Sequence, residues 1–330
     1  MKTIRFGAKG PTVSQFGIGA MSFAGIYGDA TEADSHAVLD ACHAAGVSHI
    51  DTSNVYGAGR SEEIIGTWFA QNKGARDKML LATKAGITGQ PDRRFNNDHD
   101  YMADCLDASL SRMGVDHVDL FDAHRYDIRH SPEELGGTLK ALLDSGKTRA
   151  VGLSEVAPAT LRRVASECPI AAVQSEYSLS TRAPELGLIQ TCAELDVTLV
   201  AFSPVGRAFL TDSPFSYERG QSMAFTKNNP RFMQPNYAAN IAATDRFRAL
   251  AVDMGYPAAA LAIAWVMAQS PHVLPIPGTK NVDHLAELIL GTQITLSASD
   301  IAQIEAVLPV GWAHGDRYST VQWEGPERYC

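Results

Sequence analysis

Four side chains in this sequence have the types and the order needed for proton transfer at a carbonyl group. Asp51 and Tyr56 lie in the segment SHIDTSNVYG, Lys84 follows the run MLLAT, and His124 lies in VDLFDAHRYD. Adding a hydride to a carbonyl carbon requires a proton at the oxygen, which an acid poised near the working pH can supply. A tyrosine, its activator, an anchor for that activator and an imidazole would together make such a site.

Tyr56 is the candidate acid, although a free tyrosine is too weak near neutral pH. Lowering its pKa from about 10 toward about 7 requires about 4 kcal/mol. A lysine ammonium at about 4 Å, in a medium with an effective dielectric constant of about 20, supplies about that amount, so Lys84 could activate Tyr56. Asp51 would keep Lys84 charged and oriented, and His124 would hydrogen-bond the substrate oxygen.

Each of the four also has a purely structural interpretation. Asp51 could cap the next turn, Lys84 could be a solvated charge, and His124 could belong to a surface network with Arg125 and Asp127. The chemical interpretation is favoured because all four lie at or just after the ends of consecutive predicted strands.

Those strands are short runs of β-forming residues that alternate with stretches of helical periodicity, a pattern typical of βαβ units around a parallel sheet. The eight predicted strands cover residues 15–20, 48–52, 79–84, 118–124, 149–154, 171–175, 198–203 and 273–277. The predicted helices cover residues 31–45, 61–72, 100–113, 132–145, 159–167 and 184–195. The pattern predicts an α/β fold, a (β/α)8 TIM barrel, whose active site forms at the C-terminal ends of the strands.

Three further segments complete the predicted architecture. The opening residues carry a Gly-Pro turn between two short β-like runs and predict an N-terminal hairpin that closes the barrel floor. Residues 205–240 and the tail after Gly311 do not fit the repeat and predict long loops at the C-terminal face, since loops of that length tend to be functional or disordered. No linker interrupts the chain, so residues 1–330 are predicted to form a single barrel domain.

The motifs at these strand ends resemble those of the aldo-keto reductase superfamily, in particular its bacterial-type members. The motifs are DTSNVYG, LATK, DLFDAHRYD, VGLSE, VQSEYS, FSPVGR and IPGTK, and they extend over nearly the whole chain. The superfamily carries an Asp-Tyr-Lys-His tetrad in this order. The resemblance therefore implies that Asp51, Tyr56, Lys84 and His124 are catalytic, and that the enzyme reversibly reduces an aldehyde or ketone to an alcohol with NADP(H), using Tyr56 as general acid and base.

The resemblance also implies a cofactor site along the later strands. The nicotinamide is expected against Phe202, residues 203–207 over the pyrophosphate, and residues 278–280 at the adenosine end and its 2′-phosphate. The expected cofactor-binding residues are Ser154, Glu155, Gln174, Phe202, Ser203, Val205, Gly206, Arg207, Gly278, Thr279, Lys280, His284 and Glu287. NADP(H) is the preferred cofactor, but His284 stands where many relatives have arginine, so NAD(H) and an NAD-linked alcohol or sugar dehydrogenase remain open.

Residues next to the tetrad in the sequence are expected to line the substrate pocket. They are Met21, Phe23, Val55, Arg125 and Tyr126. Arg125 could attract an acidic substrate, although its neighbour Asp127 could equally neutralise it.

Some of these residues also suggest other classes of protein. Gly17-Ile18-Gly19 suggests a dinucleotide-binding fingerprint, but the sixth position of that motif is Ser22 instead of glycine. Asp51, the candidate for the acid that binds the ribose, lies farther from the glycines than the usual spacing of about 20 residues. A barrel lysine such as Lys84 could instead form a Schiff base in an aldolase or lyase. Some members of the superfamily are accessory subunits of potassium channels that retain cofactor with little turnover, and the intact tetrad favours an enzyme over this alternative.

Composition restricts the partners. The formal net charge of −9 disfavours binding to nucleic acid or to an anionic membrane, because phosphate attraction needs a basic face. No apolar run has the length of a signal peptide or a membrane span, which predicts a cytoplasmic protein with a small-molecule partner. The five cysteines, Cys330 among them, form no C-x-x-C pair, and no metal-binding motif is present. The sequence does not indicate an oligomeric state.

Overall fold

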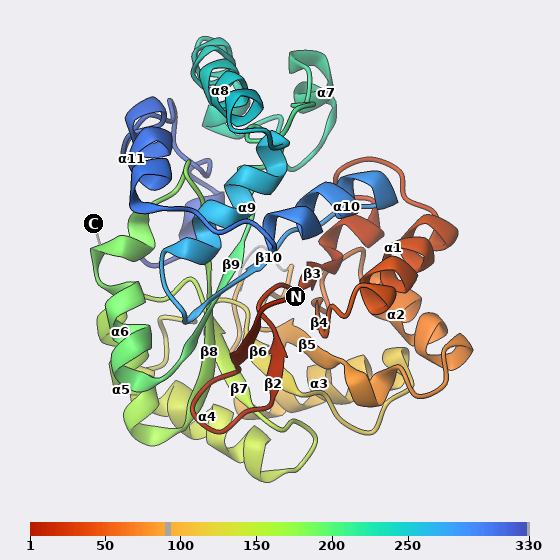
Figure 1. Ribbon diagram of the computed structural model, residues 1–330. Helices are drawn as coiled ribbons and strands as arrows, with labels where there is room; N and C mark the ends of the chain where they lie inside the picture. The colour runs from red at the N-terminus through yellow and green to blue at the C-terminus, as the bar shows by residue number, and fades with distance from the viewer. Residues whose placement is uncertain (90–93, 329–330) are drawn as a thin grey trace.

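Eight parallel strands form one sheet in the computed structural model, which describes residues 1–89 and 94–328 (Figure 1). They are β3 (Ile18–Gly19), β4 (His49–Asp51), β5 (Leu80–Ala85), β6 (Leu120–Ala123), β7 (Val151–Ser154), β8 (Ile170–Glu176), β9 (Thr198–Phe202) and β10 (Val273–Ile276). Their order in the sheet follows the chain. The N–H groups of Gly17 and Gly19 donate to the carbonyls of Pro275 and Pro277, each at 3.0 Å, which joins the first strand to the last. The predicted (β/α)8 barrel is confirmed.

A two-stranded hairpin precedes the barrel, as predicted. Its strands β1 (Thr3–Arg5) and β2 (Thr12–Ser14) are antiparallel, with Ile4 opposite Val13. Phe6, just after β1, is buried against His49 inside the barrel, with ring centroids 5.4 Å apart. The hairpin therefore closes the floor of the barrel, at the end opposite to the predicted site.

Five of the six predicted helices are present nearly as expected: α1 (Glu32–Ala44), α2 (Arg60–Gln71), α3 (His99–Met113), α4 (Pro132–Asp144) and α5 (Pro158–Glu167). The sixth is divided into a short 3-10 helix, η3 (Ala183–Leu186), and α6 (Leu188–Leu195). Gly187 lies between them with a φ of 124°, which ends the first helix. The first predicted strand is also shorter than expected, because residues 20–24 form the 3-10 helix η1 (Ala20–Ala24).

The last third of the chain contains most of the helices that the periodicity did not predict. They are α7 (Tyr217–Ser222), η4 (Pro230–Phe232), α8 (Asn236–Asp253), α9 (Ala258–Ala268), α10 (Val282–Gly291), α11 (Ala298–Val307) and η5 (Gln322–Glu324). A further short 3-10 helix, η2 (Arg76–Lys78), lies earlier in the chain, just before β5. The predicted loop 205–240 thus includes α7, η4 and the start of α8. In Figure 1, α7 and α8 project beyond the barrel. The tail after α11 returns to the start of α5, where Glu327 accepts the Ala157 N–H.

Within residues 1–89 and 94–328, no single helix is long and apolar enough to cross a membrane. The helices α8 and α9 together reach the required length and composition, but they meet at a bend of 90°. Every residue of α9 from Ala258 to Met267 is buried in the protein, so its apolar composition serves the core.

Alternation along the strands decides which side chains face the inside of the barrel, because successive residues of a strand point to opposite sides. Leu80 and Ala82 of β5 pack with Leu120 of β6 in the inner apolar cluster. Two residues further on, this alternation places Lys84 on the inner side of β5 and Asp122 on the inner side of β6, where the two are register partners. The inner layer thus changes from apolar to charged toward the C-terminal ends of the strands.

Candidate active site

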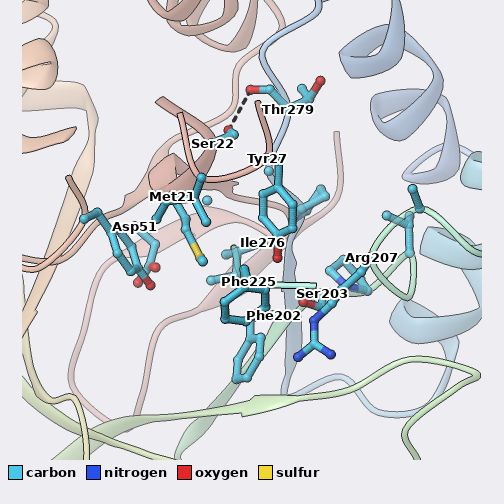
Figure 2. A pocket seen from close by; sticks show the side chains of 18 of the residues that line it. Met21, Ser22, Tyr27, Asp51, Phe202, Ser203, Arg207, Phe225, Ile276 and Thr279 are labelled. Carbon is cyan, nitrogen blue, oxygen red and sulfur yellow. Dashed lines mark hydrogen bonds between the residues drawn. The ribbon is translucent and has the colours of Figure 1, made fainter. Parts of the chain in front are cut away.

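A cleft of about 1070 Å³ opens at the C-terminal ends of the strands. Pockets for drug-sized ligands range from about 300 to 1,000 Å³, so this cleft is large enough for an extended ligand and a small second molecule. Figure 2 shows part of its lining, with Met21 and Asp51 on one side of the view, Arg207 on the other and Phe202 between them. Residues far apart in the sequence therefore meet around one cavity.

The four predicted catalytic residues are brought together at this cleft. Asp51, Tyr56 and His124 line it, while Lys84 is fully buried beneath them. Lys84 Nζ donates to Asp51 Oδ1 and to the carbonyl of Thr52, both at 2.6 Å, and lies 5.6 Å from the centre of the Tyr56 ring. The rings of Tyr56 and His124 meet edge to face, with centroids 5.8 Å apart.

Burial and charge act in opposite directions on the predicted acid. Burial raises the pKa of Tyr56 above its ordinary value of 10.0, and the positive charge of Lys84 only partly offsets this effect. Lys84 itself is held charged: burial lowers its pKa, but Asp51 and Tyr56 outweigh burial and leave the pKa raised. The expected net lowering of the Tyr56 pKa is thus not found, and Tyr56 is a protonated phenol at neutral pH.

His124 is oriented by a residue that sequence reasoning missed. The Ser53 hydroxyl lies 2.9 Å from His124 Nδ1 and 3.2 Å from the carbonyl of Lys84. Burial, with the nearby charges of Arg125 and Lys84, holds the pKa of His124 well below its ordinary range, so the imidazole is neutral. When the Ser53 proton points to Nδ1, Nε2 carries the ring proton and can donate it toward the cleft. Ser53 lies between Asp51 and Tyr56 in the sequence, and this position could have identified it as part of the site.

Most of the predicted cofactor-binding residues also line the cleft. They are Ser154, Gln174, Phe202, Ser203, Val205, Arg207, Gly278, Thr279, Lys280, His284 and Glu287. Gln174 Nε2 donates to Asp51 Oδ2 at 2.9 Å, which links the strand β8 to the tetrad. Lys280 Nζ donates to the carbonyl of Asp29, and the loop that contains Asp29 therefore lies across this end of the cleft.

Two predicted cofactor-binding residues lie outside the cleft lining. The Glu155 carboxylate is buried, forms an ion pair with Arg317 and accepts the N–H of Glu176 at 2.8 Å. Gly206 is buried in the turn after β9, where an added Cβ would lie 3.0 Å from the Ser180 hydroxyl oxygen. Neither residue presents a free group to a ligand in this structure.

The predicted substrate pocket divides in the same way. Met21, Val55 and Arg125 line the cleft, whereas Phe23 and Tyr126 do not. Phe23 lies in η1 with its side chain fully buried in the main apolar core. Tyr126 is buried on the outer side of the strand end, and its hydroxyl donates to the carbonyl of His130. Neither residue therefore lines the cleft in this structure: Tyr126 follows the cleft-lining Arg125 just after a strand end, where neighbours face opposite sides of the barrel wall, and Phe23 lies in a 3-10 helix, where strand alternation does not apply.

Comparison with known proteins agrees with this geometry. The model of the aldo/keto reductase family matches residues 15–309. The chain belongs to the aldo/keto reductase family. It is 36% identical over 316 residues to aldo-keto reductase yakc of Schizosaccharomyces pombe, whose name specifies NADP(+), and the match covers 93% of this chain and 92% of that protein.

Two further relatives extend the comparison of this aldo/keto reductase. Probable aldo-keto reductase 1 of Glycine max is 35% identical over 321 residues, covering 96% of this chain and 92% of that protein. Among solved structures, the glycerol dehydrogenase AKR11B4 from Gluconobacter oxydans is similar with a TM-score of 0.80 and 25% identity. That match covers 93% of this chain and 94% of the other.

The aldo/keto reductase also contains a buried charge network that the sequence did not reveal. Glu176 pairs with Arg207 at 2.6 Å, with Arg317 at 3.5 Å and with Arg231 at 3.6 Å. Burial pushes the pKa of Glu176 up, but the three arginines outweigh burial and leave the pKa below its ordinary value. Together with the Glu155–Arg317 pair, this network attaches the C-terminal tail to the ends of β7 and β8 beside the cleft. The partners are separated by up to 162 residues, so no local pattern predicts them.

Proposed function

We propose that this aldo/keto reductase reversibly reduces an aldehyde or ketone to an alcohol with NADP(H), and that Tyr56 is the proton donor. The observation that carries the proposal is the cluster of Tyr56, His124 and the Lys84–Asp51 pair at a cleft whose volume, about 1070 Å³, is large enough for a dinucleotide. The intact cluster favours an enzyme over an accessory subunit with little turnover. The proposed partner is a small carbonyl compound or alcohol, and a cytoplasmic location stays a prediction.

The residues along the cleft fit a dinucleotide. Half-buried Phe202 offers a flat ring, and Ser154 and Gln174 beside it offer polar groups for a carboxamide. The turn after β9 has positive φ angles at Ser203, Gly206, Arg207 and Ala208. In the described part of the chain, the N–H groups of residues 205, 207 and 208 donate to no protein acceptor, which suits a pyrophosphate. When bound, the nicotinamide would supply the hydride.

Proton transfer is the step that the chain itself performs. Because Tyr56 is protonated at neutral pH, its hydroxyl can give a proton to the oxygen of a carbonyl group as negative charge develops there. Lys84 then stabilises the phenolate that remains, and Asp51 keeps Lys84 in place. His124 Nε2–H would hold the same oxygen and fix the carbonyl group against the cleft wall.

The basis for preferring NADP(H) lies at the other end of the cleft. Lys280 and His284 line it, and a lysine suits a 2′-phosphate. The name of the yakc protein, which specifies NADP(+), supports the same choice. Glu287 lines the cleft as well, and an acid near the adenosine ribose suits NAD(H), which keeps an NAD-linked dehydrogenase as the second candidate.

Replacing Lys280 tests this preference. We expect Lys280→Ala to raise the dissociation constant for NADPH about tenfold and that for NADH much less, because only NADPH has the extra phosphate. The measurement is the quenching of tryptophan fluorescence during titration with each cofactor. Equal changes for the two cofactors would exclude this role for Lys280.

The proposed reaction is tested by following NADPH consumption at 340 nm with a panel of aldehydes and ketones. We expect saturable binding of NADPH and consumption that depends on the carbonyl compound. If the purified protein binds neither NADPH nor NADH, the proposed function is wrong, and trapping of a carbonyl compound on Lys84 with borohydride becomes the next measurement.

A further inference from the structure

We infer that this aldo/keto reductase acts on carbonyl compounds that carry a carboxylate, and that Arg125 binds that carboxylate. The inference rests on the proposed function, because it concerns the second group of the molecule whose carbonyl faces Tyr56. It depends on three features of Arg125: its position in the cleft, the lack of an acidic partner and the edge of the guanidinium that remains open.

Arg125 lies directly after His124 and lines the same cleft as Tyr56. Its side chain is half-buried, and the tail packs closely on its aliphatic part. A Cβ added to Gly325 would lie 2.9 Å from both Cγ and Cδ of Arg125. The side chain is therefore held in position, and a group bound to its guanidinium would stand beside the tetrad.

The acidic residues near Arg125 are paired with other cations. Asp127 binds Arg129, whose Nε lies 2.8 Å from Asp127 Oδ1, so it does not neutralise Arg125 as the sequence alone allowed. Glu155 is occupied by Arg317. In residues 1–89 and 94–328 no carboxylate oxygen lies within 4.0 Å of the Arg125 guanidinium. An unpaired cation in a half-buried site beside the tetrad favours an anionic ligand group.

The hydrogen bonds of Arg125 define which edge is open. Its Nη1 donates to the carbonyl of His124 at 2.6 Å and to the Ser154 hydroxyl oxygen at 3.0 Å. Among the described residues, Nε and Nη2 have no acceptor. Both nitrogens are accessible to solvent.

This protein itself uses the same edge of arginine to bind carboxylates. Arg163 donates from Nε and Nη2 to the two oxygens of Glu133, both at 2.7 Å. Arg182 binds Glu185 in the same way, at 2.7 and 2.8 Å. A carboxylate matches two parallel N–H groups, so the open edge of Arg125 suits this group in particular.

The test compares acids with their uncharged esters. The probes are 3- and 4-carboxybenzaldehyde and their methyl esters, reduced with NADPH by the full-length protein. For at least one acid we expect kcat/KM to exceed that of its ester by about tenfold or more, because a hydrogen bond between charged groups is worth about that much. We expect Arg125→Gln to remove this preference and Arg125→Lys to restore part of it.

Arg94 provides a matched control, since it lines the same cleft but already pairs with Glu324 at 2.9 Å. Arg94→Gln should leave the ratio of acid to ester near that of the unmodified protein. The inference would be overturned, with the proposed function left intact, if the esters were reduced as well as both acids. The same would follow if Arg94→Gln removed the preference for the acid and Arg125→Gln did not. No reduction of any of the four aldehydes by a protein that binds NADPH would also overturn the inference, whereas a protein that binds neither NADPH nor NADH would refute the proposed function and the inference with it.

Discussion

Three ionisable side chains share the inner surface of the barrel just below Tyr56. Lys84 and Asp51 form a pair, whereas Asp122 on the neighbouring strand is fully buried and neither of its oxygens has a partner. An added Cβ on Gly152 would lie 2.1 Å from Asp122 Oδ1, so the carboxyl group fills the space that a larger residue would need. Buried carboxyl groups without a partner are rare, because burial penalises the charged form.

Asp122 therefore gives folding a defined dependence on pH. Burial raises the pKa of Asp122 well above its ordinary range, and Lys84 offsets only part of this effect. The folded state then holds a proton that the unfolded chain releases above about pH 4, so stability is lost as the pH rises toward the folded pKa. We expect the free energy of unfolding of Asp122→Asn to rise relative to that of the unmodified protein as the pH increases from about 5 to about 8, as measured by urea unfolding. A difference that stays constant over this range would show that Asp122 is already charged in the folded state.

At this scale the sequence predicted the tetrad because each member lies at or just after a strand end. It did not predict which neighbours face the cleft: Met21 does and Phe23, two residues later, does not. A 3-10 helix replaces the end of the expected strand there, so the alternation that would have decided the direction is lost. Arg317 could not be found at all, because its partners lie far away in the sequence.

At the scale of elements, the tail after α11 is held by charges. Arg317 pairs with Glu155. Glu327 accepts the Ala157 N–H at 2.6 Å and so caps the start of α5, which has no capping side chain of its own. The tail also supplies Tyr318 and Gln322 to the cleft. The sequence predicted a long segment at this face, but its attachments depend on contacts between distant elements.

Removing Arg317 should therefore be costly. Arg317→Gln leaves Glu155 buried without its main partner, and we expect a loss of about 3–5 kcal/mol in the free energy of unfolding, measured by urea titration. The pair Arg162–Glu194, at 2.6 Å but about half exposed, is the control. Arg162→Gln should cost about 1 kcal/mol or less. Similar losses for the two variants would contradict the role given to the buried network.

At the scale of the whole molecule, regular alternation of strands and helices predicted the barrel, and the six predicted helices end at residue 195. The later helices were missed for different reasons. In α9 every residue from Ala258 to Met267 is buried, so the helix has no polar face and no periodicity to recognise. The helices α7 and η4 and the start of α8 lie within residues 205–240, and η5 lies in the tail after Gly311, both of which the sequence predicted as loops. No prediction from the sequence covered α10 and α11, which lie outside both segments. The organisation of residues 1–330 as a single domain stays a prediction, and Cys330 lies outside the described residues.

The proton transfer from Tyr56 is the central claim, and one substitution tests it most directly. We expect Tyr56→Phe to lower kcat for carbonyl reduction by about 100- to 10,000-fold, the usual contribution of a general acid, while the dissociation constant for NADPH stays within about twofold. The control is Tyr126→Phe, which removes a hydroxyl outside the cleft and should keep its turnover. Loss of turnover in Tyr56→Phe alone, with NADPH still bound, is the predicted result. Unchanged turnover in a folded Tyr56→Phe protein would contradict the account.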